Sequence, residues 1–156
     1  MTEDNAIQHQ VRLWNPITRV IAVALTLPAC SWFAKPTTDI QGFLCRSTAQ
    51  MYENGSLKSF ELAQDEVLQG HLIPAGSRVF LDPNGILEGS WLARDMVYDG
   101  IPCRGGFAKV HTGFHPNGRV KTAFLSRDTV IQGVPCEASL MVPVRFTADG
   151  LLLPEN

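Results

Sequence analysis

The stretch FHPNGRVKTAFLSRDTVIQGVPC, residues 114–136, decides how the rest of this sequence is read. It recurs without gaps as LDPNGILEGSWLARDMVYDGIPC, residues 81–103, and more loosely as MYENGSLKSFELAQDEVLQGHLI, residues 51–73. A residue that recurs at a fixed period generally serves the repeating unit, whereas an active site needs a unique constellation of side chains. The recurrence therefore favours a structural unit used several times over a catalytic motif.

Turn-forming pairs mark each copy of the repeat. They are Asn54-Gly55, Asn84-Gly85, Asn117-Gly118 and the variant pair Asp149-Gly150, whose glycines are 30, 33 and 32 residues apart. Asn-Gly and Asp-Gly tolerate the positive φ that tight hairpin turns require. Apolar and polar residues alternate on both sides of these pairs, which is typical of half-buried strands. The sequence therefore predicts a β-hairpin around each pair.

Three further markers recur in register with the turns. A leucine stands seven residues after the turn glycine, an aspartate ten residues after it, and a valine two residues after the aspartate. These markers are Leu62, Leu92 and Leu125, then Asp65, Asp95 and Asp128, then Val67, Val97 and Val130. We expect the aspartates to accept backbone N–H bonds at the opposite turn. A second recurring glycine is expected to mark a bulge or a close backbone approach where the chain re-enters the sheet; it is found at Gly42, Gly70, Gly100 and Gly133.

The predicted fold is all-β, an elongated, single-sheet antiparallel meander that grows by one hairpin per repeat. It covers residues 38–156, with units of about 38–67, 68–97, 98–130 and 131–156, and each unit contacts mainly its neighbours. The pattern x-x-Asn-Gly-x-Leu after an aromatic or apolar residue resembles the MORN repeat in its bacterial variant form. The best matches are Tyr52 to Gly55 and Phe114 to Gly118. This resemblance implies a binding, scaffolding or membrane-associated module.

The N-terminal segment is predicted to be a lipoprotein-type signal peptide, residues 1–29, followed by a tether, residues 30–37. Val20 to Leu27 is apolar except for Thr26; it is too short to span a membrane and fits the apolar region of a signal peptide. The sequence Leu-Pro-Ala-Cys that ends at Cys30 resembles the bacterial lipobox. This resemblance implies lipidation of Cys30 and anchoring to a membrane, and Ser31 after it implies the outer membrane, facing the periplasm.

Composition and motifs exclude several functional classes. The net charge is −2 and no basic cluster stands out, so we expect no nucleic-acid partner. The sequence contains no P-loop, dinucleotide fingerprint or G-x-S-x-G elbow. His111 and His115 are four residues apart, but they lie on a predicted strand and no HExxH motif joins them. We therefore expect no catalytic residue, no cofactor and no metal ligand.

The cysteines of the repeat occupy one position, three residues after the second glycine. Cys45, Cys103 and Cys136 stand there, and Ile73 replaces them in the remaining copy. An isoleucine as the substitute indicates a buried apolar position, where a free cysteine behaves as a small hydrophobic residue. Equivalent positions in successive hairpins are about 9.5 Å apart, beyond the roughly 7 Å that a disulfide can bridge. We expect no bridge between Cys103 and Cys136.

The aromatic residues admit two interpretations. They form a ladder that holds the hairpins together, or some of them face outward and form a binding surface for a peptide, a glycan or a lipid headgroup. The residues concerned are Phe80, Trp91, Phe114, Phe124 and Phe146. The repeating glycine can shift the strand register, so alternation alone does not assign the face.

The leading hypothesis is a non-enzymatic, lipid-anchored cell-envelope protein that acts as a scaffold or interaction surface for a protein or another envelope component. One alternative is an envelope enzyme, or an accessory subunit of one, with a pocket of non-repeating residues such as His71, Tyr98 and Arg104. Another alternative is a soluble ligand-binding β module whose N-terminal segment is structural.

The lipidation hypothesis is tested by growing a Gram-negative bacterium that expresses the chain in radiolabelled palmitate. We expect the wild-type chain to incorporate label and the Cys30→Ala variant to incorporate none, because Cys30 is the predicted acceptor. Cys136→Ala serves as the control and should remain labelled. Label that persists in Cys30→Ala would rule out Cys30 as the acceptor.

Overall fold

The computed structural model describes residues 37–46, 49–106 and 110–154. All of these residues belong to one compact unit, Ala34–Asn156. The predicted signal peptide, Cys30 and all but the last residue of the predicted tether lie outside the described residues.

The described part of the chain contains fifteen short β-strands and no helix. The strands are β1 (Thr38–Ile40), β2 (Phe43–Cys45), β3 (Gln50–Met51), β4 (Leu57–Glu61), β5 (Glu66–Leu68), β6 (His71–Ile73), β7 (Arg78–Leu81), β8 (Leu87–Trp91), β9 (Met96–Tyr98), β10 (Ile101–Cys103), β11 (His111–Phe114), β12 (Val120–Ala123), β13 (Thr129–Ile131), β14 (Val134–Cys136) and β15 (Val144–Arg145).

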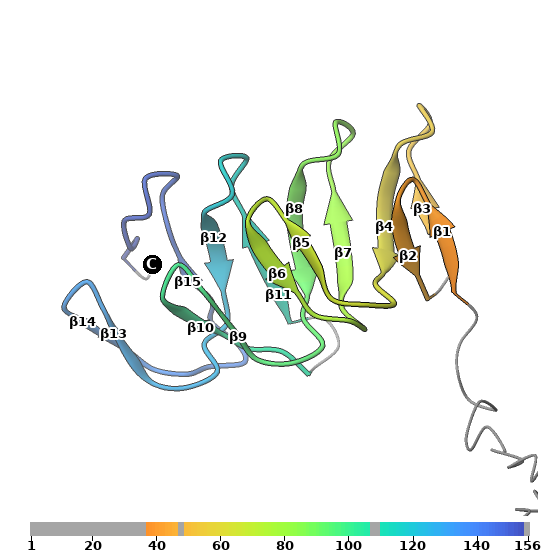
Figure 1. Cartoon of the computed structure of the whole chain (residues 1–156). Coiled ribbons are helices and arrows are strands. Elements are labelled where there is room, and N and C mark those ends of the chain that lie inside the picture. Colours follow the sequence, from red (N-terminus) through yellow and green to blue (C-terminus); the bar gives the residue numbers. More distant parts are fainter. Residues whose placement is uncertain (1–36, 47–48, 107–109, 155–156) are drawn as a thin grey trace, which may run out of the picture. The chain divides into compact units, whose positions relative to one another are not determined.

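Seven of these strands form one antiparallel sheet, the main sheet, in the order β15-β12-β11-β8-β7-β4-β3. The other eight form four two-stranded hairpins, the short hairpins, which are β1-β2, β5-β6, β9-β10 and β13-β14. Figure 1 shows that the short hairpins lie along one face of the main sheet. The predicted all-β antiparallel meander of hairpins is confirmed.

The structure differs from the expected single sheet in one respect. Each full unit contributes four strands, two to the main sheet and two to a short hairpin that forms its own sheet. The unit boundaries expected after residues 67, 97 and 130 therefore fall inside β5, β9 and β13. A structural unit begins at the short hairpin and ends with the return strand of the main sheet.

The main-sheet turns lie where the sequence predicts them. In the first, the N–H of Gly55 donates to the carbonyl of Tyr52 at 2.9 Å, and the other three turns make the same bond. The turn glycines have φ between 81° and 86°. A three-residue hairpin loop that ends in a glycine at positive φ gives this geometry. The four glycines are Gly55, Gly85, Gly118 and Gly150.

The second recurring glycine has a different role from the one expected. It is the second residue of a two-residue turn that closes each short hairpin, not a bulge, and the residue before it also has positive φ, between 48° and 53°. Positive φ at both central residues defines a type I′ turn. These turns are Gln41-Gly42, Gln69-Gly70, Asp99-Gly100 and Gln132-Gly133.

A non-glycine residue at positive φ costs roughly 1–2 kcal/mol, and long-range hydrogen bonds offset this cost in three of the four turns. In each case the side chain of the first turn residue forms a hydrogen bond with the backbone of a residue in, or next to, a main-sheet turn. The bonds join Gln41 Nε2 to Gly55 O (2.8 Å), Val120 N to Asp99 Oδ2 (2.8 Å), and Gln132 Nε2 to Gly150 O (2.7 Å). The short hairpins are thus tied to the main sheet at their tips.

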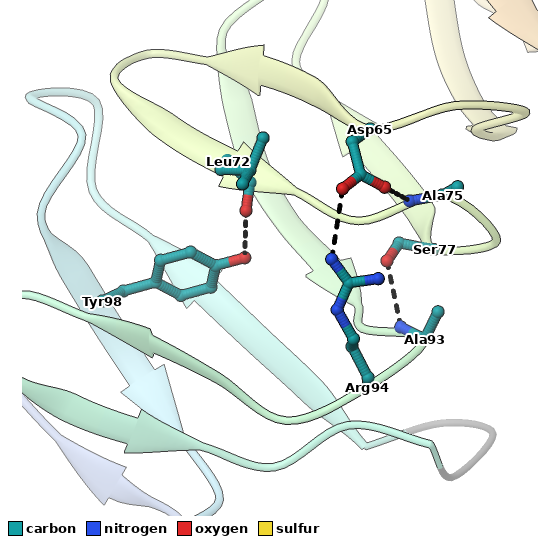
Figure 2. Close-up of polar contacts among 7 residues, drawn as sticks. All are labelled: Asp65, Leu72, Ala75, Ser77, Ala93, Arg94 and Tyr98. Atoms are coloured by element: carbon teal, nitrogen blue, oxygen red, sulfur yellow. Dashed lines mark hydrogen bonds and ion pairs between the residues drawn. The ribbon is translucent and has the colours of Figure 1, made fainter.

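The recurring aspartates close the opposite end of the short hairpins, as predicted. Each carboxylate accepts the backbone N–H ten residues later: Ala75 to Asp65 (2.7 Å), Gly105 to Asp95 (2.8 Å) and Ala138 to Asp128 (2.7 Å). Figure 2 shows that Asp65 also accepts a hydrogen bond from Arg94, 3.1 Å away, at the start of the next unit. These two contacts lower the pKa of Asp65, the bond from Ala75 N most strongly.

The core lies between the main sheet and the short hairpins, and the cysteine position is part of it. The exposed fraction is 1% for Cys45, 0% for Ile73 and 0% for Cys103, so the predicted buried apolar position is confirmed for these residues. Cys136 is half-buried, and all three cysteines are free thiols. Burial raises the pKa of Cys103 to about 12.

We predict that Asp95→Ala lowers the free energy of unfolding by about 1 kcal/mol, because the backbone N–H of Gly105 loses its acceptor. Asp95→Asn is the matched control, since the amide oxygen can still accept that bond, and its loss should be smaller. Urea denaturation measures both values. Equal losses in the two variants, or no loss in either, would contradict the assigned role.

Candidate interaction surfaces

The outer face of the main sheet, turned away from the short hairpins, carries a group of ring side chains. Trp91 of β8 pairs with His111 of β11. The ring of Phe80, on β7, contacts Trp91 edge-on at 5.0 Å and His111 at 5.7 Å. Ala123, the last residue of β12, is fully buried. Phe124 comes next, and because side chains alternate between the two faces along a strand, it lies on the outer face. We call Phe80, Trp91, His111 and Phe124 the outer aromatic patch; all four are half-buried.

Gly89 allows His111 to lie directly on the backbone of β8. A Cβ atom at Gly89 would clash with the imidazole and lie 2.7 Å from the carbonyl oxygen of Thr112. Burial lowers the pKa of His111, so the patch gains no charge from this residue at neutral pH. The equivalent positions in the first and third units hold Ser59 and Thr122, so this close packing is particular to the second unit.

Two of the aromatic residues expected at a binding surface are buried instead. Phe114 and Phe146 belong to the core, each only 4% exposed. The expectation that they can form part of an exposed surface is therefore wrong. A register shift between Gly113 and Phe114 places Phe114 on the inner face, which simple alternation along the strand does not reveal.

The non-repeating residues His71, Tyr98 and Arg104 do not form one site. His71 and Tyr98 meet with their ring centroids 5.0 Å apart, and His71 stacks on Phe114 at 4.9 Å. The hydroxyl of Tyr98, which is in the core, donates to Leu72 O at 2.9 Å and so links two short hairpins (Figure 2). Arg104 instead donates to the carbonyl of Leu125, 3.0 Å away.

The short hairpins of the second, third and fourth units each expose a valine at the same recurring position, on the face turned away from the main sheet. The exposed fraction is 65% for Val67, 57% for Val97 and 67% for Val130. We call these three residues the valine row. Each is the central residue of the first strand of its hairpin, and Asp39 holds the same place in the first unit. The recurring valines are visible in the sequence, but their spacing alone does not show that they face solvent.

The cross-strand partners of the valines vary in exposure. Val67 pairs with Leu72, which is also exposed, whereas Val97 pairs with the buried Pro102. Each unit adds two strands to the main sheet, so successive units advance by about 9.5 Å. The valine row is therefore a regularly spaced set of apolar side chains on a surface that three hairpins share.

A groove of about 880 Å³ lies beside the last short hairpin, and we call it the terminal groove. One wall is β14 with Glu137, and the other includes β15, Leu152 and Leu153. Val142 and Pro143 also line it, and Leu140 and Met141 immediately before them are exposed. A smaller cavity of about 240 Å³ lies between the turn at Asp99 and the residues Val130 to Gln132.

Residues 37–46, 49–106 and 110–154 contain no group of three or more His, Cys, Asp or Glu side chains placed to hold a metal ion. Within the same residues, no helix is long and apolar enough to cross a membrane. What this part of the structure offers chemically is a set of apolar surfaces.

Comparison with known proteins finds no family model, no curated protein and no solved structure that matches this chain. The resemblance to MORN repeats and to the lipobox therefore stays a prediction.

We predict that Gly89→Ala lowers the free energy of unfolding by about 1–3 kcal/mol, because the new Cβ overpacks the site against His111 and Thr112. Adding His111→Ala should recover part of this loss, since only the contact with the backbone of Thr112 then remains. Thermal or urea unfolding of the two single variants and the double variant gives the coupling energy. Strictly additive losses would show that His111 does not lie on Gly89.

Proposed function

We propose that this chain is a non-enzymatic, lipid-anchored protein of the bacterial cell envelope, held at the outer membrane facing the periplasm. Its repeat array acts as a scaffold that binds a protein or another envelope component. The resemblance of the residues around Cys30 to a lipobox supports the anchor, and the surfaces of the array support the binding role.

The valine row is the observation that carries the binding role. Its members are not needed to fill the core, because the next residue of each strand, Leu68, Tyr98 or Ile131, packs toward the main sheet. Covering side chains of this size and exposure contributes roughly 1 kcal/mol each. Aliphatic residues repeated at one exposed position across three units form a larger apolar surface than single scattered residues do.

Hydrogen bonds hold together the short hairpins that carry the valine row, so the valines are in a fixed arrangement before a partner binds. The aspartate contacts close each hairpin, and the bond from Tyr98 to Leu72 joins neighbouring hairpins. Preorganised surfaces lose less conformational entropy on binding. The outer aromatic patch supplies a second surface, since Phe80, Trp91 and Phe124 are partly exposed on the opposite layer.

The proposal is tested by in-cell cross-linking and affinity capture with the wild-type chain and the variant Val67→Thr/Val97→Thr/Val130→Thr. Threonine keeps the branched shape and strand preference but makes the surface polar. We expect the triple variant to capture the wild-type partner at least tenfold less and to melt within a few degrees of the wild type. Leu151→Thr, at another exposed aliphatic residue, should capture normally. Undiminished capture by the triple variant would contradict the role of the valine row.

A further inference from the structure

A histidine ring lies between the second and third units, where a short hairpin approaches a main-sheet turn. His71 is the first residue after the type I′ turn of β5-β6. Its ring stacks on Phe114, with the centroids 4.9 Å apart, and meets Tyr98 edge-on at 5.0 Å. Its Nε2 also donates a hydrogen bond to the carbonyl of Gly118, the last residue of the turn. A ring side chain thus closes the junction between these two units.

The corresponding junction between the third and fourth units contains the cavity of about 240 Å³, which we call the junction cavity. Its lining residues hold the repeat positions of the histidine contact: Ile101 corresponds to His71, Ile131 to Tyr98, Phe146 to Phe114 and Gly150 to Gly118. Isoleucine is smaller than tyrosine and does not extend as far as histidine, and lost side-chain reach between packed elements leaves a cavity. Gly118 is buried whereas Gly150 is half-buried, so the later junction is more open to solvent.

The hydrogen bond that His71 makes is supplied differently at the junction cavity. Gln132 Nε2 donates to the carbonyl of Gly150 at 2.7 Å. In the preceding junction Asp99 stands at the position of Gln132, and a carboxylate accepts hydrogen bonds but does not donate them. An occupant of the junction cavity therefore needs no donor for this carbonyl. Shape and apolar contact decide what fits.

The junction cavity opens on the surface that carries the valine row. Val130, one of the three valines, lines the cavity and is 67% exposed. The buried ring of Phe146 forms part of the wall. A partner that covers the valine row therefore also covers the entrance to the cavity.

We infer that the junction cavity receives one aromatic side chain of the protein partner. Its ring lies against Phe146, as the ring of His71 lies against Phe114, and offset or edge-on contact between rings stabilises this arrangement. Aromatic side chains that enter a pocket commonly contribute much of the affinity of a protein interface. This inference rests on the proposed binding role and adds the chemistry of one anchor to it.

The probe for the cavity is p-cresol, the side chain of tyrosine as a free molecule. It is titrated into the full chain carrying Cys30→Ala, with ¹³C-labelled isoleucine and valine methyl groups observed by NMR. We expect saturable ring-current shifts at the methyl groups that line the cavity, which are those of Ile101, Val120, Val130 and Ile131. The non-planar molecule 4-methylcyclohexanol should bind at least fivefold more weakly, and equal binding would contradict a site for an aromatic ring.

Two substitutions at one position separate filling of the cavity from a change of the side chain itself. Ile101→Phe places a ring in the cavity from within, as Phe43 does at this position of the first unit, and should weaken p-cresol binding at least tenfold. Ile101→Val leaves the cavity open and should bind within about threefold of the parent chain. Ile131→Tyr, which restores the residue type of Tyr98, is a second filling variant in case Ile101→Phe does not fold. Melting temperatures identify the folded variants.

Affinity capture shows whether the ring belongs to the partner. Ile101→Phe should capture the wild-type partner at least tenfold less, whereas Ile101→Val should capture it normally. Undiminished capture by Ile101→Phe would overturn the partner assignment and leave a site for a free aromatic molecule. Absence of saturable p-cresol shifts, or equal p-cresol binding by the Ile101→Phe and Ile101→Val chains, would overturn the inference as a whole.

Failure of this inference and failure of the proposed function are distinguishable, because the p-cresol titration needs no partner. Undiminished capture by the threonine variant of the valine row contradicts the role of the row, whatever the titration shows. Loss of capture in that variant, combined with no p-cresol binding by the parent chain, contradicts the junction cavity alone.

Discussion

The structure depends on the contacts that join the short hairpins to the main sheet. In the first and third units the end of a main-sheet strand continues past its own sheet and pairs with the second strand of the short hairpin. The same few residues therefore belong to both layers, and the cysteine position is buried where the layers meet. This strand pairing, the bonds at the hairpin tips and the shared core hold the short hairpins in place, because isolated two-stranded hairpins are marginally stable in water.

The two-layer arrangement also determines where function can lie. The inner faces of both layers form the core, so the outer faces of the two layers are available for binding. The outer aromatic patch is on one layer and the valine row is on the other. The terminal groove lies beside the short hairpin of the fourth unit. Each of these surfaces is thus a consequence of how the repeats stack.

Residue type and spacing predict much of this fold. The Asn-Gly turns, the aspartates that accept a backbone N–H ten residues later and the buried cysteine position each follow from local chemistry that recurs in several copies. The short hairpins were not predicted as separate sheets, because three of their four turns are Gln-Gly, which is not a usual type I′ pair; only Asp99-Gly100 is. The side chain of Gln41 supports its own turn by bonding to Gly55 O, fourteen residues away. The side of the sheet on which Phe114 lies could not be predicted from the sequence either, because register shifts occur in β3, β7 and β11.

The most direct test of the two-layer account is the reactivity of the three repeat cysteines in the folded chain with Cys30→Ala. Iodoacetamide labelling followed by mass spectrometry reports each thiol separately. The account predicts that Cys136 reacts readily, whereas Cys45 and Cys103 react only when urea unfolds the protein. Modification of Cys103 in the folded protein at the rate of Cys136 would contradict it, because the position where the two layers meet would then be open to solvent.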